Sequence, residues 1–134
     1  MDKLATTLRT AQLVAHCFHN QTRGISFFAD HEFFADLYAA YEEAYDSIIE
    51  RDIGLGEDCD CAKISADAGA AAGKYDPRDM AADEMCAVLL GMERQIQAEA
   101  TAATKGASIG TANLLGDLAD KSEMRVYKLR QRIK

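Results

Sequence analysis

The sequence predicts an all-α protein, a four-helix bundle in which a long crossover joins the second and third helices. Four segments carry apolar residues at the three- and four-residue spacing of one helical face. The segments are separated by turn residues, chiefly glycine, and the only proline, Pro77, lies where the third segment is expected to begin. A chain of 134 residues, 49% of them hydrophobic, fits one domain spanning residues 1–134.

The first two helices are expected over residues 2–21 and from Asp30, a plausible N-cap, to Gly54 or Gly56. Arg23 and Gly24 interrupt the periodicity between them. The apolar face of the first helix consists of Leu4, Leu8, Ala11, Ala15 and Phe18, and that of the second of Phe34, Leu37, Tyr38, Tyr41, Tyr45, Ile48 and Leu55.

Residues 57–76 form a connection that is acidic at first and then rich in alanine and glycine. A crossover of about 20 residues at this place is a feature of bundles of the ferritin type, and a short helix over 62–72 is expected within it. A disordered linker is the alternative. The segment Cys59-Asp60-Cys61 is compatible with binding a soft metal, but without a second cysteine pair an ordinary loop is the favoured interpretation.

The third helix is expected to open with Asp76 as N-cap and Pro77 at its first position. After a turn over 106–110, Thr111 is the expected cap of a fourth helix, and most of the cationic end of that helix is expected to be exposed to solvent. The two apolar faces are Met85, Leu89, Met92, Ile96, Ala100 and Ala103, then Leu115, Leu118, Ser122, Val126, Leu129 and Ile133.

Charge and composition limit the class of protein. The net charge of −7 disfavours nucleic-acid binding, because phosphates repel an acidic surface. No apolar run approaches the ~20 residues that span a bilayer, and the first residues lack the apolar region of a signal peptide. We therefore expect a soluble cytoplasmic protein whose four cysteines are free thiols.

Imidazoles and carboxylates recur at spacings suited to a metal between His16 and Glu50. Within one helix, His31 and Asp46 are fifteen residues and about 22 Å apart, so one ion cannot contact both. Asp46 and Glu50 share a face, one turn apart. Either these are unrelated surface residues, or the imidazoles of one chain meet the carboxylates of another across a two-fold axis.

The same residues resemble the Dps family, the mini-ferritins named for DNA protection in starved cells. The pattern begins with His19 in the string His-Asn-Gln-Thr-Arg-Gly. His31-Glu32 follows twelve residues after His19, at the end of the string Phe27-Phe-Ala-Asp-His31-Glu32, and then comes Asp46 with Ser-Ile-Ile-Glu50-Arg51. Gly110-Thr-Ala-Asn-Leu-Leu115 resembles the start of the family's last helix, so the resemblance covers most of the chain.

The resemblance implies a dodecameric hollow shell that binds ferrous iron at its two-fold interfaces. His19 and His31 would come from one subunit, and Asp46 and Glu50 from its partner. The implied activity is ferroxidase, oxidation of Fe(II), preferably with hydrogen peroxide, followed by storage of ferric mineral. Zinc is a possible substitute, since imidazole and carboxylate suit both ions, and open coordination positions would admit the oxidant.

Several positions depart from the family pattern. Ala35 stands where the family has an iron-binding Asp, and the neighbouring Asp36 points about 100° away round the helix. Asp36, Glu32 and His16 are weaker candidate ligands. Glu32 is also a candidate bridging group, and for His16 a place at the edge of the core is the favoured interpretation. The protein has no Trp, although the family usually has one after the first histidine. In the family, acidic residues before the last helix line a pore through which iron enters the shell. This chain has the uncharged residues 106–110 at that place.

Other functions remain open at this stage. One is a shell of the same type whose site is impaired by Ala35 or occupied by zinc, serving as a structural or binding protein. Another is DNA protection, for which the cations Arg130, Arg132 and Lys134 are the only substitute for a basic arm, so weak or no DNA binding is expected. A monomeric helical interaction module is a further alternative.

Overall fold

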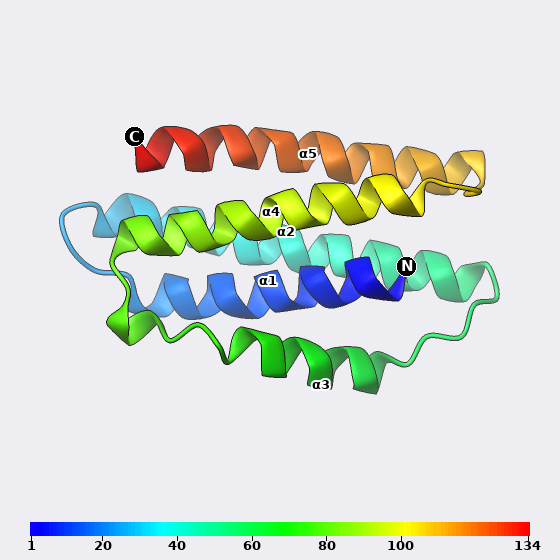
Figure 1. Ribbon diagram of the computed structural model, residues 1–134, viewed down its shortest axis with the longest axis horizontal. Helices are drawn as coiled ribbons and strands as arrows, with labels where there is room; N and C mark the ends of the chain where they lie inside the picture. Colours follow the sequence, from blue (N-terminus) through cyan, green and yellow to red (C-terminus); the bar gives the residue numbers. More distant parts are fainter.

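Four long helices run side by side along the molecule in the computed structural model, which describes residues 1–134 (Figure 1). They are α1 (Asp2–Gln21), α2 (Phe27–Gly54), α4 (Ala82–Ala103) and α5 (Ile109–Ile133). Helices α1 and α5 run in one direction, and α2 and α4 in the other. The chain contains five α-helices and no strand, which confirms the predicted all-α bundle.

The connection between α2 and α4 returns along the whole length of the bundle (Figure 1). It holds α3 (Cys61–Ala72) and a short 3-10 helix, η1 (Pro77–Asp79). The predicted short helix over 62–72 is therefore confirmed to within one residue. Asp60 caps α3 by accepting a hydrogen bond from the backbone N–H of Lys63 at 3.0 Å. Helix α3 packs against α1, and its two buried residues, Ile64 and Ala68, lie one turn apart.

Two of the predicted N-caps are wrong. Helix α2 begins at Phe27 after Ser26, so Asp30 is not a cap but a buried residue of its first turn. Helix α5 begins at Ile109, and Ser108 is its cap: the Ser108 Oγ accepts a hydrogen bond from the Thr111 N–H at 3.2 Å. In both cases a serine earlier in the chain takes the cap, and the predicted residue is buried within the helix.

The prediction for Asp76 and Pro77 holds for η1 rather than for the long helix. Asp76 accepts a hydrogen bond from the Arg78 N–H at 3.0 Å, and Pro77 occupies the first position of the 3-10 turn. The backbone is then extended at Met80 and Ala81, and α4 starts at Ala82. Asp76 and Pro77 therefore do start a helix, but that helix is the single 3-10 turn of η1 and not α4.

The core is one continuous cluster of buried side chains that all four long helices share. Phe18, Phe34, Tyr41, Leu89 and Leu115 are its most enclosed large members. The predicted apolar faces lie in it with one clear exception. Leu55 is 58% exposed, because it follows the last residue of α2.

A buried glutamate connects three helices inside this core. Both carboxylate oxygens of Glu93, on α4, are hydrogen-bonded: Oε1 accepts from the Tyr41 hydroxyl at 2.5 Å and from Arg125 Nε at 2.6 Å, and Oε2 accepts from the Ser122 hydroxyl at 2.5 Å. Burial, followed by the negative charge of Glu93, raises the pKa of Tyr41 well above its ordinary value. The cation–carboxylate pair compensates a charge that would otherwise be costly to bury.

Most of the cationic end of α5 is exposed to solvent, as expected, but Arg132 is partly buried and paired. Arg132 donates hydrogen bonds to both carboxylate oxygens of Asp30, at 2.9 and 2.8 Å, and to Asp83 at 2.7 Å. It therefore ties the start of α2 to α4 and α5. None of the helices combines the length and the apolar character that crossing a bilayer requires.

Candidate metal centre

His19 and His31 lie together where α1 ends and α2 begins. His19 is in the last turn of α1, and His31 is in the second turn of α2. The chain reverses between them through Gly24, whose φ of 104° favours glycine. The adjacent core residues Phe18 and Phe34, both fully buried with ring centroids 6.1 Å apart, fix the two helices at this level.

The two imidazoles are held by reciprocal hydrogen bonds. His19 Nδ1 lies 2.7 Å from the carbonyl oxygen of His31, and His31 Nδ1 lies 2.8 Å from the carbonyl oxygen of His19. Because a carbonyl only accepts, each Nδ1 carries the proton and donates it. In the neutral form of each ring the lone pair is then on Nε2, the atom through which such a histidine binds a metal.

Aromatic rings on both sides hold the pair in place. The His19 and His31 rings are stacked with centroids 3.8 Å apart. Phe27 stacks on the other side of His31 at 5.0 Å, and the Tyr38 ring meets His19 edge-on at 5.5 Å. The fixed orientation lowers the entropic cost of bringing both Nε2 atoms to one ion.

His16 does not complete a three-histidine site. Its ring is exposed and stacks on Tyr38 with centroids 4.2 Å apart, and it lies 6.1 Å from the His19 ring. The structure brings no third donor within reach of the pair, because the only group of three close metal-ligating side chains lies elsewhere. Within one chain, the pair offers two ligands.

Asp46 and Glu50 lie far from the histidines on the same helix. Both are exposed, and no ion pair within the chain involves either carboxylate. Since α2 is one continuous helix, Asp46 is about 22 Å from His31 along its axis. The chain therefore presents two imidazoles at one end of α2 and two carboxylates near the other.

Next to His31, the first turns of α2 offer few further donors. Ala35, one turn after His31, is half-buried and has no ligand atom. Asp36 and Glu32 are exposed carboxylates on neighbouring positions, and neither belongs to a group of close donors.

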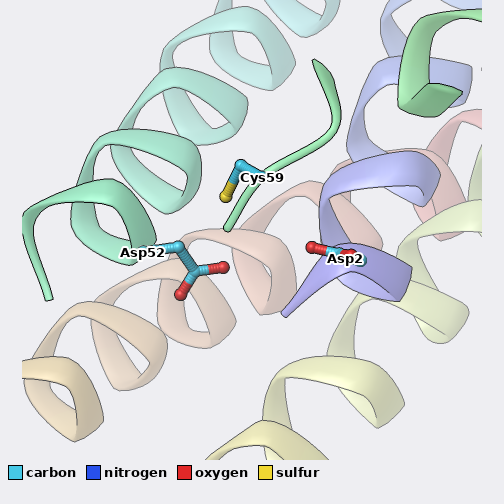
Figure 2. Close-up of side chains that lie close together, drawn as sticks. All are labelled: Asp2, Asp52 and Cys59. Carbon is cyan, nitrogen blue, oxygen red and sulfur yellow. The ribbon is translucent and has the colours of Figure 1, made fainter. Parts of the chain in front are cut away.

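A second group of donors, not predicted from the sequence as a unit, lies at the opposite end of the bundle. Asp2, Asp52 and Cys59 come from the start of α1, the end of α2 and the connection to α3, and one ligand atom of each lies within 4.8 Å of the others (Figure 2). Burial, followed by the negative charges of Asp52 and Asp2, raises the pKa of the Cys59 thiol. Only the Cys59-Asp60-Cys61 segment is visible as a signal in the sequence; the two aspartates are brought to it by the pairing of α1 with α2.

No protein-family model matches the sequence, and no curated protein matches it either. The functional case therefore depends on the His19–His31 pair, on the exposed carboxylates of α2, and on the spacing of these residues along the chain. Two neutral imidazoles with free Nε2 atoms can bind a first-row metal ion, and two further carboxylates would complete a ligand set suited to Fe(II) or Zn(II).

Proposed function

We propose that this chain is the subunit of a cytoplasmic iron-storage protein of the Dps type, which binds Fe(II) at sites shared by two subunits and oxidises it with hydrogen peroxide. The observation that carries the proposal is the pair of fixed, metal-competent imidazoles of His19 and His31, which lacks the carboxylates it needs within its own chain. The spacing of His19, His31, Asp46 and Glu50, which resembles the family pattern, supports the same conclusion.

The position of these residues on α2 favours a two-fold partner. The centre of α2 lies between Ala40 and Tyr41, and residues 31 and 50 are equidistant from it. A second, antiparallel α2 related by a two-fold axis at this centre would bring Glu50 of the other subunit level with His31. It would also bring Asp46 level with Ala35, where this chain has no ligand. Each interface would hold two equivalent sites.

Small and apolar side chains on the outer sector of α2 fit such a contact. Ala35 and Ala39 lie on the sector of the helix that carries His31, Asp46 and Glu50, and their small size permits close approach of two helices. Phe28, 85% exposed, and Ile53, 55% exposed, are equidistant from the helix centre and would meet across the axis. Apolar side chains would thus cover the outer edge of each site.

The bundle supports the proposal at the level of architecture. Helices α2 and α4 are parallel, and a connection with its own helix, α3, crosses the length of the molecule between them (Figure 1). One long crossover between the second and third bundle helices is the arrangement of ferritin-like proteins. The dodecameric shell itself belongs to the proposal.

The ligands of the proposed site act on iron as a substrate. Neutral Nε2 atoms and carboxylates bind Fe(II), and the carboxylates stabilise the additional charge of Fe(III). Two Fe(II) ions each give one electron to one hydrogen peroxide, whose O–O bond breaks; two protons are taken up, and two Fe(III) and two waters result. Removing the ions and the peroxide together suppresses hydroxyl-radical formation.

DNA protection is the weaker assignment for this chain. Of the three cations at the end of α5, Arg132 is engaged by Asp30 and Asp83, which leaves Arg130 and Lys134 exposed. Two cations per subunit do not offset a net charge of −7. We propose that DNA binding is weak or absent.

A second candidate function is a shell of the same type that holds zinc and does not oxidise iron. The observation that favours it is Ala35, which gives each site one carboxylate fewer than the family pattern. Such a site would bind a divalent ion but would have one carboxylate fewer to stabilise the additional charge of Fe(III). The protein would then act as a structural or metal-binding assembly.

Two measurements test the proposal together. Sedimentation at neutral pH is expected to give an assembly of the mass of a dodecamer, and a monomer would exclude a shared site. Anaerobic Fe(II) followed by hydrogen peroxide is expected to give ferric absorbance faster than the protein-free solution. Assembly without faster oxidation would favour the zinc-binding alternative.

A further inference from the structure

The group formed by Asp2, Asp52 and Cys59 combines three segments that are far apart in the sequence. Figure 2 shows the Cys59 thiol facing the two carboxylates as the third corner of a triangle, with Asp52 projecting from α2 and Asp2 from the first turn of α1. The group lies at the end of the bundle opposite to the His19–His31 pair (Figure 1). It is therefore separate from the proposed iron site and does not depend on it.

Asp52 is the member that points to a ligand. Its side chain is 7% exposed, yet its carboxylate accepts no hydrogen bond from the protein, and its one cationic neighbour is the amino group of Met1, at 3.6 Å. A buried carboxylate is usually satisfied by close, charge-assisted hydrogen bonds, as Asp30 and Glu93 are in this molecule. Asp52 instead faces another carboxylate and a thiol, and a cation would satisfy all three.

The chemistry of the donors identifies the class of cation. A thiolate selects zinc and similar borderline or soft ions over calcium and magnesium, which take oxygen ligands. We propose that Asp2, Asp52 and Cys59 bind one divalent ion of the zinc class. The Cys59 thiol loses its proton to solvent on binding, and water occupies the fourth position.

Only small movements are needed to form the site. Donor atoms around a tetrahedral zinc ion are roughly 3.3–3.8 Å apart, given bonds of 2.0–2.3 Å. In this structure they lie within 4.8 Å of one another, so closure needs shifts of about 1 Å. Asp2 is exposed and Cys59 lies in a connection rather than a helix, so side-chain rotation can supply these shifts.

An acidic approach leads to the group. An open cavity of about 560 Å³ is lined by Asp2 and Asp52 and by two further carboxylates, Glu57 and Asp58, against the cations of Lys105 and the Met1 amino group. The negative charge of the carboxylates raises the local concentration of divalent cations at low ionic strength. The bound ion would join the start of α1, the end of α2 and the segment leading to α3.

Cobalt(II) is a direct probe, because thiolate coordination gives an intense near-ultraviolet charge-transfer band. The wild-type protein is expected to show this band at one equivalent of Co(II) per chain, and zinc is expected to displace it. Cys59→Ser is expected to abolish the band, and Asp52→Asn to weaken binding by at least about tenfold. The exposed Asp2→Asn, which does not disturb the core, is expected to weaken binding in the same direction.

Matched variants separate this site from other thiols and from the histidine pair. Cys17→Ser and Cys61→Ser remove the other two accessible thiols and are expected to keep the band, as is His31→Ala. Zinc is also expected to raise the melting temperature of His31→Ala, which lacks the histidine pair, but not of the double variant His31→Ala/Cys59→Ser. A band that persists in Cys59→Ser, or that disappears in His31→Ala, would overturn the proposal.

Discussion

His19 and His31, twelve residues apart in the sequence, each donate the Nδ1 proton to the other's backbone carbonyl, at 2.7 and 2.8 Å. The contact joins the end of α1 to the start of α2 and leaves both Nε2 atoms free. A metal ion bound within one chain would have only these two imidazoles as protein ligands. The proposed shared site follows from that incompleteness.

Replacing His31 by alanine is expected to lower Fe(II) affinity by at least about tenfold, because it removes one ligand and the ring stacked on His19 at 3.8 Å, although the backbone carbonyl that accepts the His19 Nδ1 proton remains. Anaerobic equilibrium dialysis measures the change. His16→Ala is the matched control, since its exposed ring stacks on Tyr38 outside the pair. Equal loss of affinity in the two variants would contradict the assigned role of His31.

The substitution Ala35→Asp tests the missing carboxylate. It places a ligand one turn after His31, on the sector that also carries Asp46 and Glu50, and is expected to raise Fe(II) affinity about tenfold and to speed oxidation. Ala39→Asp, one turn further along the same sector, adds the same charge away from the histidines. If both variants bind iron equally, charge alone explains the gain and the site geometry is wrong.

The pair of Asp30 with Arg132 is expected to contribute to stability. Asp30→Asn leaves the Arg132 guanidinium, 26% exposed, without its buried carboxylate partner and should lower the free energy of unfolding by about 2–3 kcal/mol at neutral pH. Asp83→Asn removes the exposed partner of the same arginine and should cost less than about 1 kcal/mol. Urea denaturation measures both, and the reverse order would contradict the assignment.

The contribution of Asp30 also predicts a pH dependence. Burial alone would raise the pKa of Asp30, but hydrogen bonds from Arg132 and Ser26, with the Arg132 charge, outweigh it and hold the pKa below its ordinary value of 3.8. A lowered pKa in the folded state means that the stabilisation is present above pH 3.8 and is lost as the pH falls through the folded-state value. The difference in stability between wild type and Asp30→Asn is expected to shrink over that acid range, and a constant difference would disagree.

Glu93 is expected to be the most costly polar residue to remove from the core. Glu93→Ala leaves the Arg125 side chain, 13% exposed, and the Tyr41 hydroxyl without partners, and should destabilise the fold by about 3–5 kcal/mol. Tyr41→Phe leaves Glu93 with two other donors and should cost about 1 kcal/mol. Thermal unfolding of both variants, with Glu93→Gln as the isosteric control, would show whether the charge or the volume matters.

Local patterns were sufficient to predict the helices but not their first residues. One face of each helix is buried, so its apolar residues recur at helical spacing in the sequence. This spacing was enough to predict the apolar faces of the four long helices and the short helix over 62–72. Asp30 and Thr111 have the chemistry of caps, yet both are buried, and a nearby serine precedes each helix instead. The partner that makes Asp30 a core residue, Arg132, is 102 residues away and invisible to a local pattern.

The candidate site was predictable in part, for the same physical reason. Helical geometry separated His31 from Asp46, and α2 is continuous over both. The reciprocal hydrogen bonds of the two histidines depend on how α1 packs against α2, which spacing does not give. The Asp2–Asp52–Cys59 group was missed because three helix ends meet there, and only Cys59 had a sequence motif.

The most direct test of a shared site mixes two inactive variants. One carries His19→Ala with His31→Ala, and the other carries Asp46→Asn with Glu50→Gln. When both are unfolded and refolded together in equal amounts, half of the two-fold pairs combine one chain of each kind. Each mixed pair has one intact site of its two, so about one quarter of the wild-type sites return.

The measurement is the initial rate of ferric absorbance after anaerobic Fe(II) loading and addition of hydrogen peroxide. We expect each variant alone to match the protein-free rate and the refolded mixture to recover about one quarter of the wild-type rate. Recovery no greater than that of the separate variants, with the wild type active, would show that the iron site is not shared between subunits. A wild type no faster than the protein-free solution would contradict the proposed activity itself.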